Sequence, residues 1–268
     1  GSMERERPGR DRGTDKGGDR RNREAALAEA ELLRKTNAIM ASSGLPQPLA
    51  RMVAGGQLDL NEAIKRLAFQ DEVNGLIQRH NFNRALATQI ALGQVSKDSM
   101  LARRRVEEHL LGSRNRSILE EAKADGRELS VGLHGHRNLR VRVLAVDRYE
   151  VDIRDLESNQ ESRIHKLQFK FAFASADFKK VRKAMSWDKV RKEKQVEPVL
   201  RPQDRYACSD RRLGLAMDKK DEVTITTLEG EIFSGHVAWV SRFELGLRTR
   251  QGVEVVIFRH ALDDFRGD

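Results

Sequence analysis

The sequence contains a single cysteine, Cys208, so no disulfide bond can form within the chain. It has no apolar run near the roughly 18 residues that a membrane-crossing helix needs. It also has no signal-peptide pattern of charged start, apolar middle and small-residue cleavage site. These absences exclude a disulfide-stabilised secreted fold and a helical membrane protein. They predict a protein of the reducing cytoplasm.

The sequence also lacks the common signatures of catalysis. There is no phosphate-binding loop, no dinucleotide-binding glycine pattern and no nucleophile elbow. His134 and His136 lie close together, but no cysteine, further histidine or paired carboxylates stand nearby at a metal-binding spacing, and we expect both on a surface loop. We therefore expect no enzyme, no cofactor and no bound metal.

Positive charge is present in excess. Lys and Arg number 50 against 41 Asp and Glu, which gives a formal net charge of +9 over 268 residues. Such a chain favours an acidic partner, with nucleic acid as the first candidate and an anionic membrane surface as the second. The length allows two or three domains that each bury a core.

The N-terminal part divides into a tail and a helical module. Residues 1–23 begin with what looks like a cloning remnant and contain almost no apolar side chain, which predicts a disordered basic tail. Residues 24–121 have apolar side chains at helical spacing. Within them, segments 45–66 and 82–103 resemble each other at an offset of 37 residues. Each segment predicts a helix, a tight turn at a glycine and a second helix.

This repeated helical hairpin leaves two interpretations open. It has the outline of a DNA-binding helix-turn-helix, but the residue spacing before the turn glycine fits that motif poorly. A docking or dimerisation module is the interpretation we favour. Asp59 followed by Glu62 predicts a capping box at the start of the second helix.

Residues 222–265 alternate short apolar stretches with turns. Val223 and Ile225 alternate with threonines, as in a half-buried strand, and Gly235 falls within a long second stretch where a glycine allows a sharp bend. The expected strands are 222–227, 232–240, 243–249, 253–258 and 261–265. We therefore expect a small five-stranded barrel.

Several residues of this segment stand in a familiar order. They are Val223, Ile225, Gly230, Gly235, Val237, Arg242, Phe243, Glu244, Leu245, Ala261 and Leu262. Together with Phe258, Arg259 and His260, the set resembles bacterial Hfq, the Sm-like (LSm) RNA chaperone. These three residues stand where the Hfq family has its Tyr-Lys-His signature. The resemblance covers residues 222–265.

A quieter version of the pattern occupies residues 128–174 and predicts a second, diverged copy. The matching pairs are 146–153 with 240–247, at an offset of 94, and Val131 and Leu133 with Val223 and Ile225, at an offset of 92. Two copies in one chain form an internal repeat, so neither rests on a single chance match.

The resemblance implies where RNA is held. In the Hfq family the aromatic residue after the second strand stacks on a uracil, while the Lys and His of the signature hold phosphate and base. Carried across, this implies RNA contact at Arg242, Phe243, Arg259 and His260 in the second copy. The alternative is that Phe243 and Phe258 are core aromatics and His260 a hydrogen-bonded turn histidine.

The first copy differs at these positions. It has Arg148, Tyr149, Lys166 and Leu167 instead. Leu167 cannot donate a hydrogen bond to a base, whereas Lys166 can still hold a phosphate. We therefore expect the second copy to carry the better nucleotide pocket.

Residues 177–221 join the two copies and are rich in cations. Basic residues around an aromatic suit RNA, because cations meet phosphates while aromatic faces stack on bases. The alternative is a solvated helical connector whose tryptophan packs on a barrel. The residues assigned to RNA binding here are Lys179, Lys180, Arg182, Lys183 and Trp187.

These observations predict an α+β protein with a helical N-terminal module and two Sm-like (SH3-like) barrels. The expected parts are a tail at 1–23, the helical module at 24–121, the first barrel at 122–176, a partly helical basic linker at 177–221 and the second barrel at 222–268. The predicted function is binding of single-stranded RNA, with uridine-rich RNA as one option, by an RNA chaperone or post-transcriptional regulator. The alternatives are an Sm-fold scaffold that mainly binds protein in a ribosome or polymerase assembly, and a DNA-binding regulator.

The expected partners follow from the same reasoning. RNA is the main one, a protein partner is possible at the helical module, and no membrane is expected. Edge strands of the barrels predict a homo-oligomer. Either the two copies pair within one chain, or three chains supply six barrels.

Overall fold

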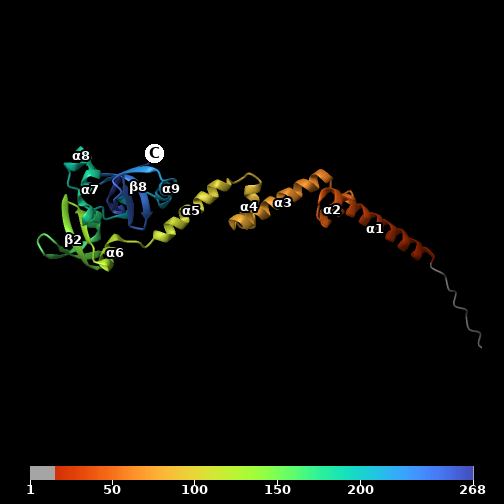
Figure 1. Cartoon of the computed structure of the whole chain (residues 1–268), viewed down its shortest axis with the longest axis horizontal. Coiled ribbons are helices and arrows are strands. Elements are labelled where there is room, and N and C mark those ends of the chain that lie inside the picture. Colours follow the sequence, from red (N-terminus) through yellow and green to blue (C-terminus); the bar gives the residue numbers. More distant parts are fainter. Residues whose placement is uncertain (1–15, 268) are drawn as a thin grey trace, which may run out of the picture. The chain divides into compact units, whose positions relative to one another are not determined.

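The structure is a computed structural model that describes residues 16–267, so the predicted tail lies outside the described residues up to residue 15. The chain divides into two compact units, Gly1–Lys97 and Asp98–Asp268. The first is helical, and the second contains all the described strands (Figure 1). None of the described helices combines the length and apolar character needed to span a membrane.

The first helix begins earlier than expected. Residues 16–23 were predicted as disordered tail, but α1 (Lys16–Ser43) already starts at Lys16. Ion pairs one turn apart favour an exposed helix without apolar burial, and Arg20 pairs with Glu24 in this way at 3.2 Å. A low apolar content therefore did not exclude a helix here.

The predicted order of helix, glycine turn and helix is present in both copies, but the first helix of each copy packs mainly on the helix before it rather than on the helix after the turn. Each copy places a glycine with φ 71° at the turn, Gly56 after α2 (Gln47–Ala54) and Gly93 after α4 (Arg84–Ala91). The Asp59 carboxylate accepts hydrogen bonds from two N–H groups at the start of α3 (Leu60–His80), which is half of the predicted capping box; the Glu62 side chain bonds to Arg66 instead of to Asp59 N–H. The second helix of the second copy is α5 (Lys97–Ser113).

The second unit begins with two helices, and sequence reasoning had given the first of them, and the second up to residue 121, to the N-terminal module. All of α5 except Lys97, and all of α6 (Ile118–Asp125), belong to this unit. Leu110 of α5 packs against one core of the sheet, and Ile118 and Leu119 of α6 are buried in another. These buried contacts hold both helices to the strands.

The C-terminal half is one eleven-stranded antiparallel sheet, so the prediction of two separate five-stranded barrels is wrong. The strand order is β11-β7-β8-β9-β10-β5-β1-β2-β3-β4, and β6 pairs with β8 off this path. The strands are β1 (Glu128–Leu133), β2 (Arg137–Val146), β3 (Glu150–Asp155), β4 (Glu161–His165), β5 (Phe169–Ala174), β6 (Ser186–Trp187), β7 (Glu222–Thr227), β8 (Glu231–Val240), β9 (Glu244–Thr249), β10 (Glu254–Phe258) and β11 (Leu262–Gly267). The remaining helices are α7 (Phe178–Ala184), α8 (Lys189–Lys192), α9 (Asp210–Lys219) and short 3₁₀ turns at Lys166–Gln168, Ser175–Asp177, Pro202–Asp204 and Arg259–Ala261.

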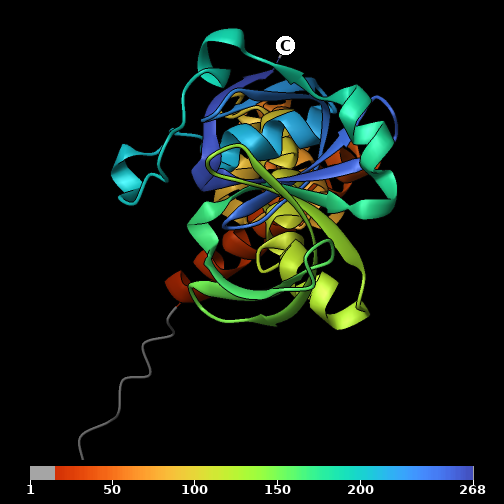
Figure 2. The same ribbon diagram turned by 90° about the vertical axis from the view of Figure 1, so that its left-hand side faces the viewer.

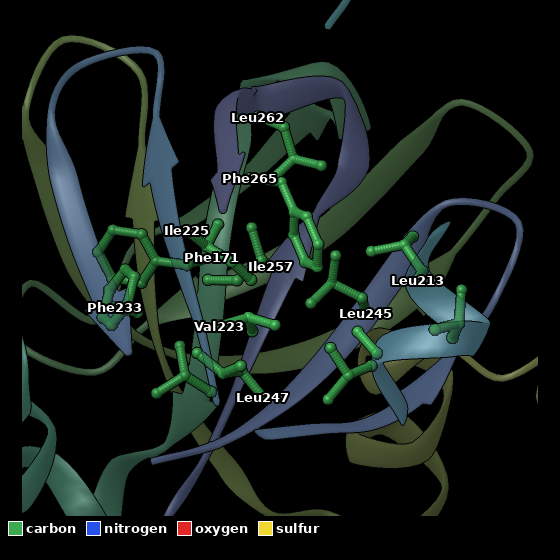
Figure 3. Packing of buried hydrophobic residues seen from close by; sticks show 14 of the residues in the cluster. Phe171, Leu213, Val223, Ile225, Phe233, Leu245, Leu247, Ile257, Leu262 and Phe265 are labelled. Carbon is green, nitrogen blue, oxygen red and sulfur yellow. The ribbon is translucent and has the colours of Figure 1, made fainter. Parts of the chain in front are cut away.

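The sheet is continuous because β5 and β10 pair with each other, with Ala172 opposite Val256 and Phe171 opposite Ile257. Side chains of a strand point alternately to its two faces. Accordingly Phe171 and Ile257 enter one core, while Ala172 and Val256 enter the other. Figure 3 shows Phe171 among the residues of the first of these cores. Alternation in the sequence predicts two faces for a strand but not which core each face joins.

Two halves of this sheet repeat each other. We call residues 118–174 (α6 and β1–β5) the first repeat and residues 210–267 (α9 and β7–β11) the second; Figure 2 shows the first in green and the second in blue. In each, a helix precedes five strands whose order in the sheet is fifth, first, second, third, fourth. Neither helix was predicted as part of its repeat.

The repeats superpose at an offset of 94 residues through their first three strands. Leu129 pairs with Val141 as Val223 pairs with Gly235, and the register shift after Val143 recurs after Val237. The predicted offset of 92 for the first strand is therefore wrong by two residues. A shift of two leaves every side chain on the same face, so alternation could not reveal it.

Candidate nucleic-acid interface

Both repeats expose an arginine followed by an aromatic residue at the same tight turn. Arg148 and Tyr149 lie between β2 and β3, and Arg242 and Phe243 lie between β8 and β9. The turns close alike: Asp147 N–H donates to the Glu150 carbonyl at 2.9 Å, and its counterpart Ser241 N–H donates to the Glu244 carbonyl at 2.8 Å. Because the two central residues of such a turn project outward, Tyr149 is 59% exposed and Phe243 is 70% exposed.

The turn of the second repeat adjoins α5. Arg242 N–H donates to the Arg114 carbonyl at 3.2 Å, and a hollow of about 260 Å³ lies between α5 and this turn. Leu111, which is exposed, lines the hollow together with Arg114 and Arg242. Among the described residues, neither arginine side chain makes an ion pair. Two carboxylates, Glu107 and Asp210, also line the hollow, but they pair with Arg103 and Arg259. An apolar ring, an apolar neighbour and two arginines without ion pairs therefore meet beside two paired carboxylates.

The turn of the first repeat has a different neighbourhood. The Arg148 guanidinium lies 5.1 Å from the centre of the Tyr149 ring, and the His165 ring stacks parallel to Tyr149 at 6.4 Å. His165 stands where the second repeat has Phe258, which is buried. The first repeat thus presents a short surface stack of a cation and two rings.

Arg259 is engaged within the protein. Its guanidinium donates to the Asp210 carboxylate at 2.7 Å and to the carbonyls of Ser241 and Cys208 at 2.9 Å each. Its backbone N–H donates to the Phe243 carbonyl at 2.8 Å, just as Lys166 N–H donates to Tyr149 in the first repeat. These bonds hold the Phe243 turn against the segment before α9, so Arg259 positions Phe243.

His260 is buried between the repeats. It is 8% exposed, and its Nε2 lies 2.8 Å from the Phe169 carbonyl of the first repeat. Burial lowers the pKa of His260 to about 4, so at neutral pH the uncharged ring donates this hydrogen bond. The resemblance to Hfq implied that His260 is accessible to RNA, but the first repeat covers this side chain. The corresponding Leu167 is half-buried at the first repeat's 3₁₀ turn.

Glu244 also joins the repeats, and no sequence pattern had singled it out as a connection. Its buried carboxylate accepts hydrogen bonds from Ser117 Oγ at 2.7 Å and from Ile118 N–H at 2.8 Å, at the start of α6. Burial raises the pKa of Glu244 to about 7 despite these bonds; the Glu121 charge adds to the rise and the Lys166 charge opposes it.

The predicted cations of α7 all lie on the surface. Lys179, Lys180, Arg182 and Lys183 are exposed, while Val181 between them is buried and anchors the helix. None of the four makes an ion pair with another described residue. The helix begins at Phe178, which is 47% exposed and lies 5.9 Å from the Arg182 guanidinium. Sequence reasoning had missed this aromatic neighbour.

Trp187 is half-buried, in β6. Its ring lies 5.9 Å from the His136 ring, and Lys192 Nζ lies 4.8 Å from it. Strand β6 pairs with the start of β8. This placement fits the alternative in which the tryptophan packs on the sheet.

A buried ionic cluster ties the linker to both repeats. Lys170 of β5 bonds to the carboxylates of Glu229 and Glu231, and Glu229 also accepts hydrogen bonds from Gly135 N–H at 2.9 Å and Val196 N–H at 3.2 Å. Burial alone would raise the pKa of Glu229, but its bonds to Lys170 and to backbone N–H groups lower that pKa to about 2.

This cluster contains the potential metal ligands of the described chain. Donor atoms of His136, Glu229 and Glu231 lie within 4.8 Å of one another. The Lys170 ammonium already contacts both carboxylates and supplies the positive charge that a metal ion would bring, so we interpret the group as structural. The expectation of a surface loop is wrong for His134, which is 4% exposed with its Nδ1 2.6 Å from the Val196 carbonyl. Glu229 is far from His134 and His136 in the sequence, so the sequence pattern did not reveal this cluster.

No protein-family model matches this chain, and no curated protein matches it.

Proposed function

We propose that this protein binds single-stranded RNA through the two Arg–aromatic turns and the cations of α7, acting as an Hfq-like RNA chaperone or post-transcriptional regulator in the cytoplasm. The observation that carries the proposal is the recurrence of an exposed arginine–aromatic pair at the same turn of both repeats. The exposed part of a large aromatic side chain adds little to folding stability, so its repetition at equivalent turns favours a binding role. The resemblance of residues 222–265 to Hfq supports the same function.

The chemistry follows from the exposed groups. Lys179, Lys180, Arg182 and Lys183 attract phosphates, and their lack of ion pairs leaves the full charge to RNA. The rings of Tyr149 and Phe243 then stack on unpaired bases, each contributing about 1–3 kcal/mol. Arg148 and Arg242 stand beside the rings to hold the adjoining phosphates. In this proposal Arg259 supports the Phe243 turn and His260 joins the two repeats, and neither touches RNA. Lys166 supports Tyr149 through its backbone N–H, which leaves its ammonium to hold a phosphate.

The proposed oligomer uses the outer strands, β4 and β11, of the continuous sheet. One of these edges is partly occupied, because the Phe265 carbonyl of β11 accepts hydrogen bonds from Arg212 at 2.7 Å and from Tyr206 at 3.4 Å. Pairing of repeats within one chain is present at β5 and β10. A ring of several chains requires Tyr206 and Arg212 to move, and the mass in solution tests for it.

The test of RNA binding is a titration of labelled oligo-U, oligo-A and duplex DNA, followed by fluorescence anisotropy at several salt concentrations. We expect tight single-strand binding that weakens with salt, at a log–log slope of about 0.7 per phosphate contacted. Tight binding to duplex alone would favour the DNA-binding regulator. No detectable binding to any single strand at low salt would contradict the proposal and favour the protein-binding scaffold.

Variants locate the site. The double variant Tyr149→Ala with Phe243→Ala should weaken oligo-U binding by about 30-fold or more, since each lost stack is worth about 1–3 kcal/mol. Leu200→Ala is the matched control, because it removes a comparably exposed apolar side chain with no assigned role. An affinity of the double variant equal to that of the control would refute the assignment.

A further inference from the structure

The linker adds a strand to the second repeat. Ser186 of β6 pairs with Ile232 and Trp187 pairs with Glu231, at the start of β8. Asp188 N–H continues the pairing with a 2.8 Å hydrogen bond to the Gly230 carbonyl. This added strand covers the part of β8 that lies before the first residue paired with β9, Gly235.

The same place is open in the first repeat. At the offset of 94, Arg137 and Asn138 of β2 correspond to Glu231 and Ile232. Strand β3 joins β2 only from Val141 onward, and Leu156 N–H reaches back to the Arg140 carbonyl at 2.8 Å. No strand in the described part of the chain pairs with residues 137–139 on the side away from β1.

The open edge offers free backbone groups. Alternate residues of a strand direct their N–H and C=O to the same side. Because Ile232 directs its groups toward β6, Asn138 directs its own toward the open side. Such an edge is a template for one more strand.

A hollow of about 710 Å³ adjoins this edge. Asn138, Leu139 and Arg140 line one side of it, and Phe173 and the half-exposed Phe178 line another. An added strand therefore has both a backbone edge to pair with and an apolar surface for a side chain.

The charges around the hollow favour an acidic occupant. Arg137 is exposed and bonds only to the His134 carbonyl, at 3.1 Å, with no carboxylate partner among the described residues. The four uncompensated cations of α7 follow directly after Phe178. In the lining itself Arg127 and Arg140 are both paired with carboxylates, and Glu128 and Glu157 are the anions, so the excess of positive charge comes from Arg137 and α7. Cations exceed anions at this edge.

We propose that residues 137–140 bind an acidic, extended peptide of another protein as an additional strand, in the way that β6 lies on β8. The peptide backbone pairs with Asn138, an acidic residue stands opposite Arg137, and an apolar side chain enters the hollow beside Phe178. This is a protein-binding surface separate from the Arg–aromatic turns and goes beyond RNA binding.

The experiment selects random displayed heptapeptides on the full chain and measures the affinities of the enriched sequences. We expect acidic peptides that bind Asn138→Pro about tenfold more weakly than Asn138→Ala, because both variants lose the asparagine side chain but only proline removes the outward N–H. Tryptophan fluorescence checks that both variants are folded. Should Asn138→Pro not fold, N-methylation of alternate peptide residues makes the same test from the ligand side, and we expect a similar loss.

Other outcomes overturn the proposal. These are the absence of any enriched peptide, a preference for basic peptides, or equal binding of N-methylated and unmodified peptide. Displacement of the peptide by oligo-U, together with its insensitivity to Asn138→Pro, would instead assign the hollow to nucleic acid. RNA binding itself is measured separately through Tyr149 and Phe243, so failure of either proposal leaves the other intact.

Discussion

Replacing Glu244 by glutamine should stabilise the second unit at neutral and alkaline pH. The buried carboxylate has its pKa raised to about 7, against an ordinary value of 4.5. A carboxyl group whose pKa is raised by folding binds its proton more tightly in the folded state. Its contribution to stability is therefore fully present below pH 4.5 and is lost as the pH rises through 7. Glutamine keeps an acceptor for Ile118 N–H or Ser117 Oγ but carries no charge.

The size of the effect follows from the shift. Each pKa unit corresponds to about 1.4 kcal/mol, so the full loss is on the order of 3 kcal/mol. Near pH 4.5 the protonated acid and the amide are alike, and Glu244→Gln should match the wild type within about 1 kcal/mol. The advantage of the variant should then grow by about 1.4 kcal/mol per pH unit and level off above pH 7.

The measurement is urea unfolding at pH values from 4.5 to 8, followed by tryptophan fluorescence. Both tryptophans of the chain, Trp187 and Trp239, lie in the second unit, so the signal reports on that unit. Glu150→Gln is the matched control, because Glu150 holds the corresponding position but is half-exposed beside Arg163, and its replacement should change stability by less than about 1 kcal/mol. A Glu244→Gln protein that is less stable than the wild type at pH 8 would refute the reasoning, since the ionised carboxylate would then stabilise the α6 N-terminus.

Three further substitutions test the packing. Lys170→Met leaves two buried carboxylates without their cation and should cost about 3–5 kcal/mol in urea unfolding; a neutral effect would contradict the structural role of the cluster. Gly235→Ala should prevent folding or lower the melting temperature strongly, because a Cβ there would lie 2.1 Å from the Arg248 carbonyl oxygen. A melting temperature within about 2 °C of wild type would contradict this, because so small a shift corresponds to less than about 1 kcal/mol. His260→Leu leaves the Phe169 carbonyl without its donor and should cost about 1–3 kcal/mol, while oligo-U affinity at pH 7 stays unchanged. A loss of oligo-U affinity in the folded variant would instead indicate that His260 contacts RNA.

Local patterns predicted the strands of the second repeat well. The five expected strands differ from β7–β11 by no more than two residues at either end, because alternating residues and turn glycines report on the backbone directly. The residues of the Arg–aromatic turns were assigned from the resemblance to Hfq rather than from periodicity, and the structure places both pairs at turns between strands. Both rings are exposed as an RNA contact requires.

Contacts distant in sequence were beyond such patterns. The exposure of Arg259 and His260 depends on what covers the end of β10, and that cover comes from Asp210 and Phe169. The prediction that each repeat closes into its own barrel was wrong for a similar reason. The partner strand of β5 lies about eighty residues further along the chain, and no local pattern reports on so distant a pairing. Periodicity gives the faces of a strand, and only the assembled sheet gives their neighbours.

The pairing of β5 with β10 also has a consequence for how this protein folds during synthesis. Strand β5 leaves the ribosome well before β10, and until the second repeat arrives its outer edge has no partner strand and Phe171 lacks the core residues of that repeat, Phe233 among them. Synthesis at roughly 5–20 residues per second leaves this surface open for several seconds. A chain truncated after residue 221 should therefore aggregate rather than yield a stable first half, so the two repeats form one folding unit in the cell.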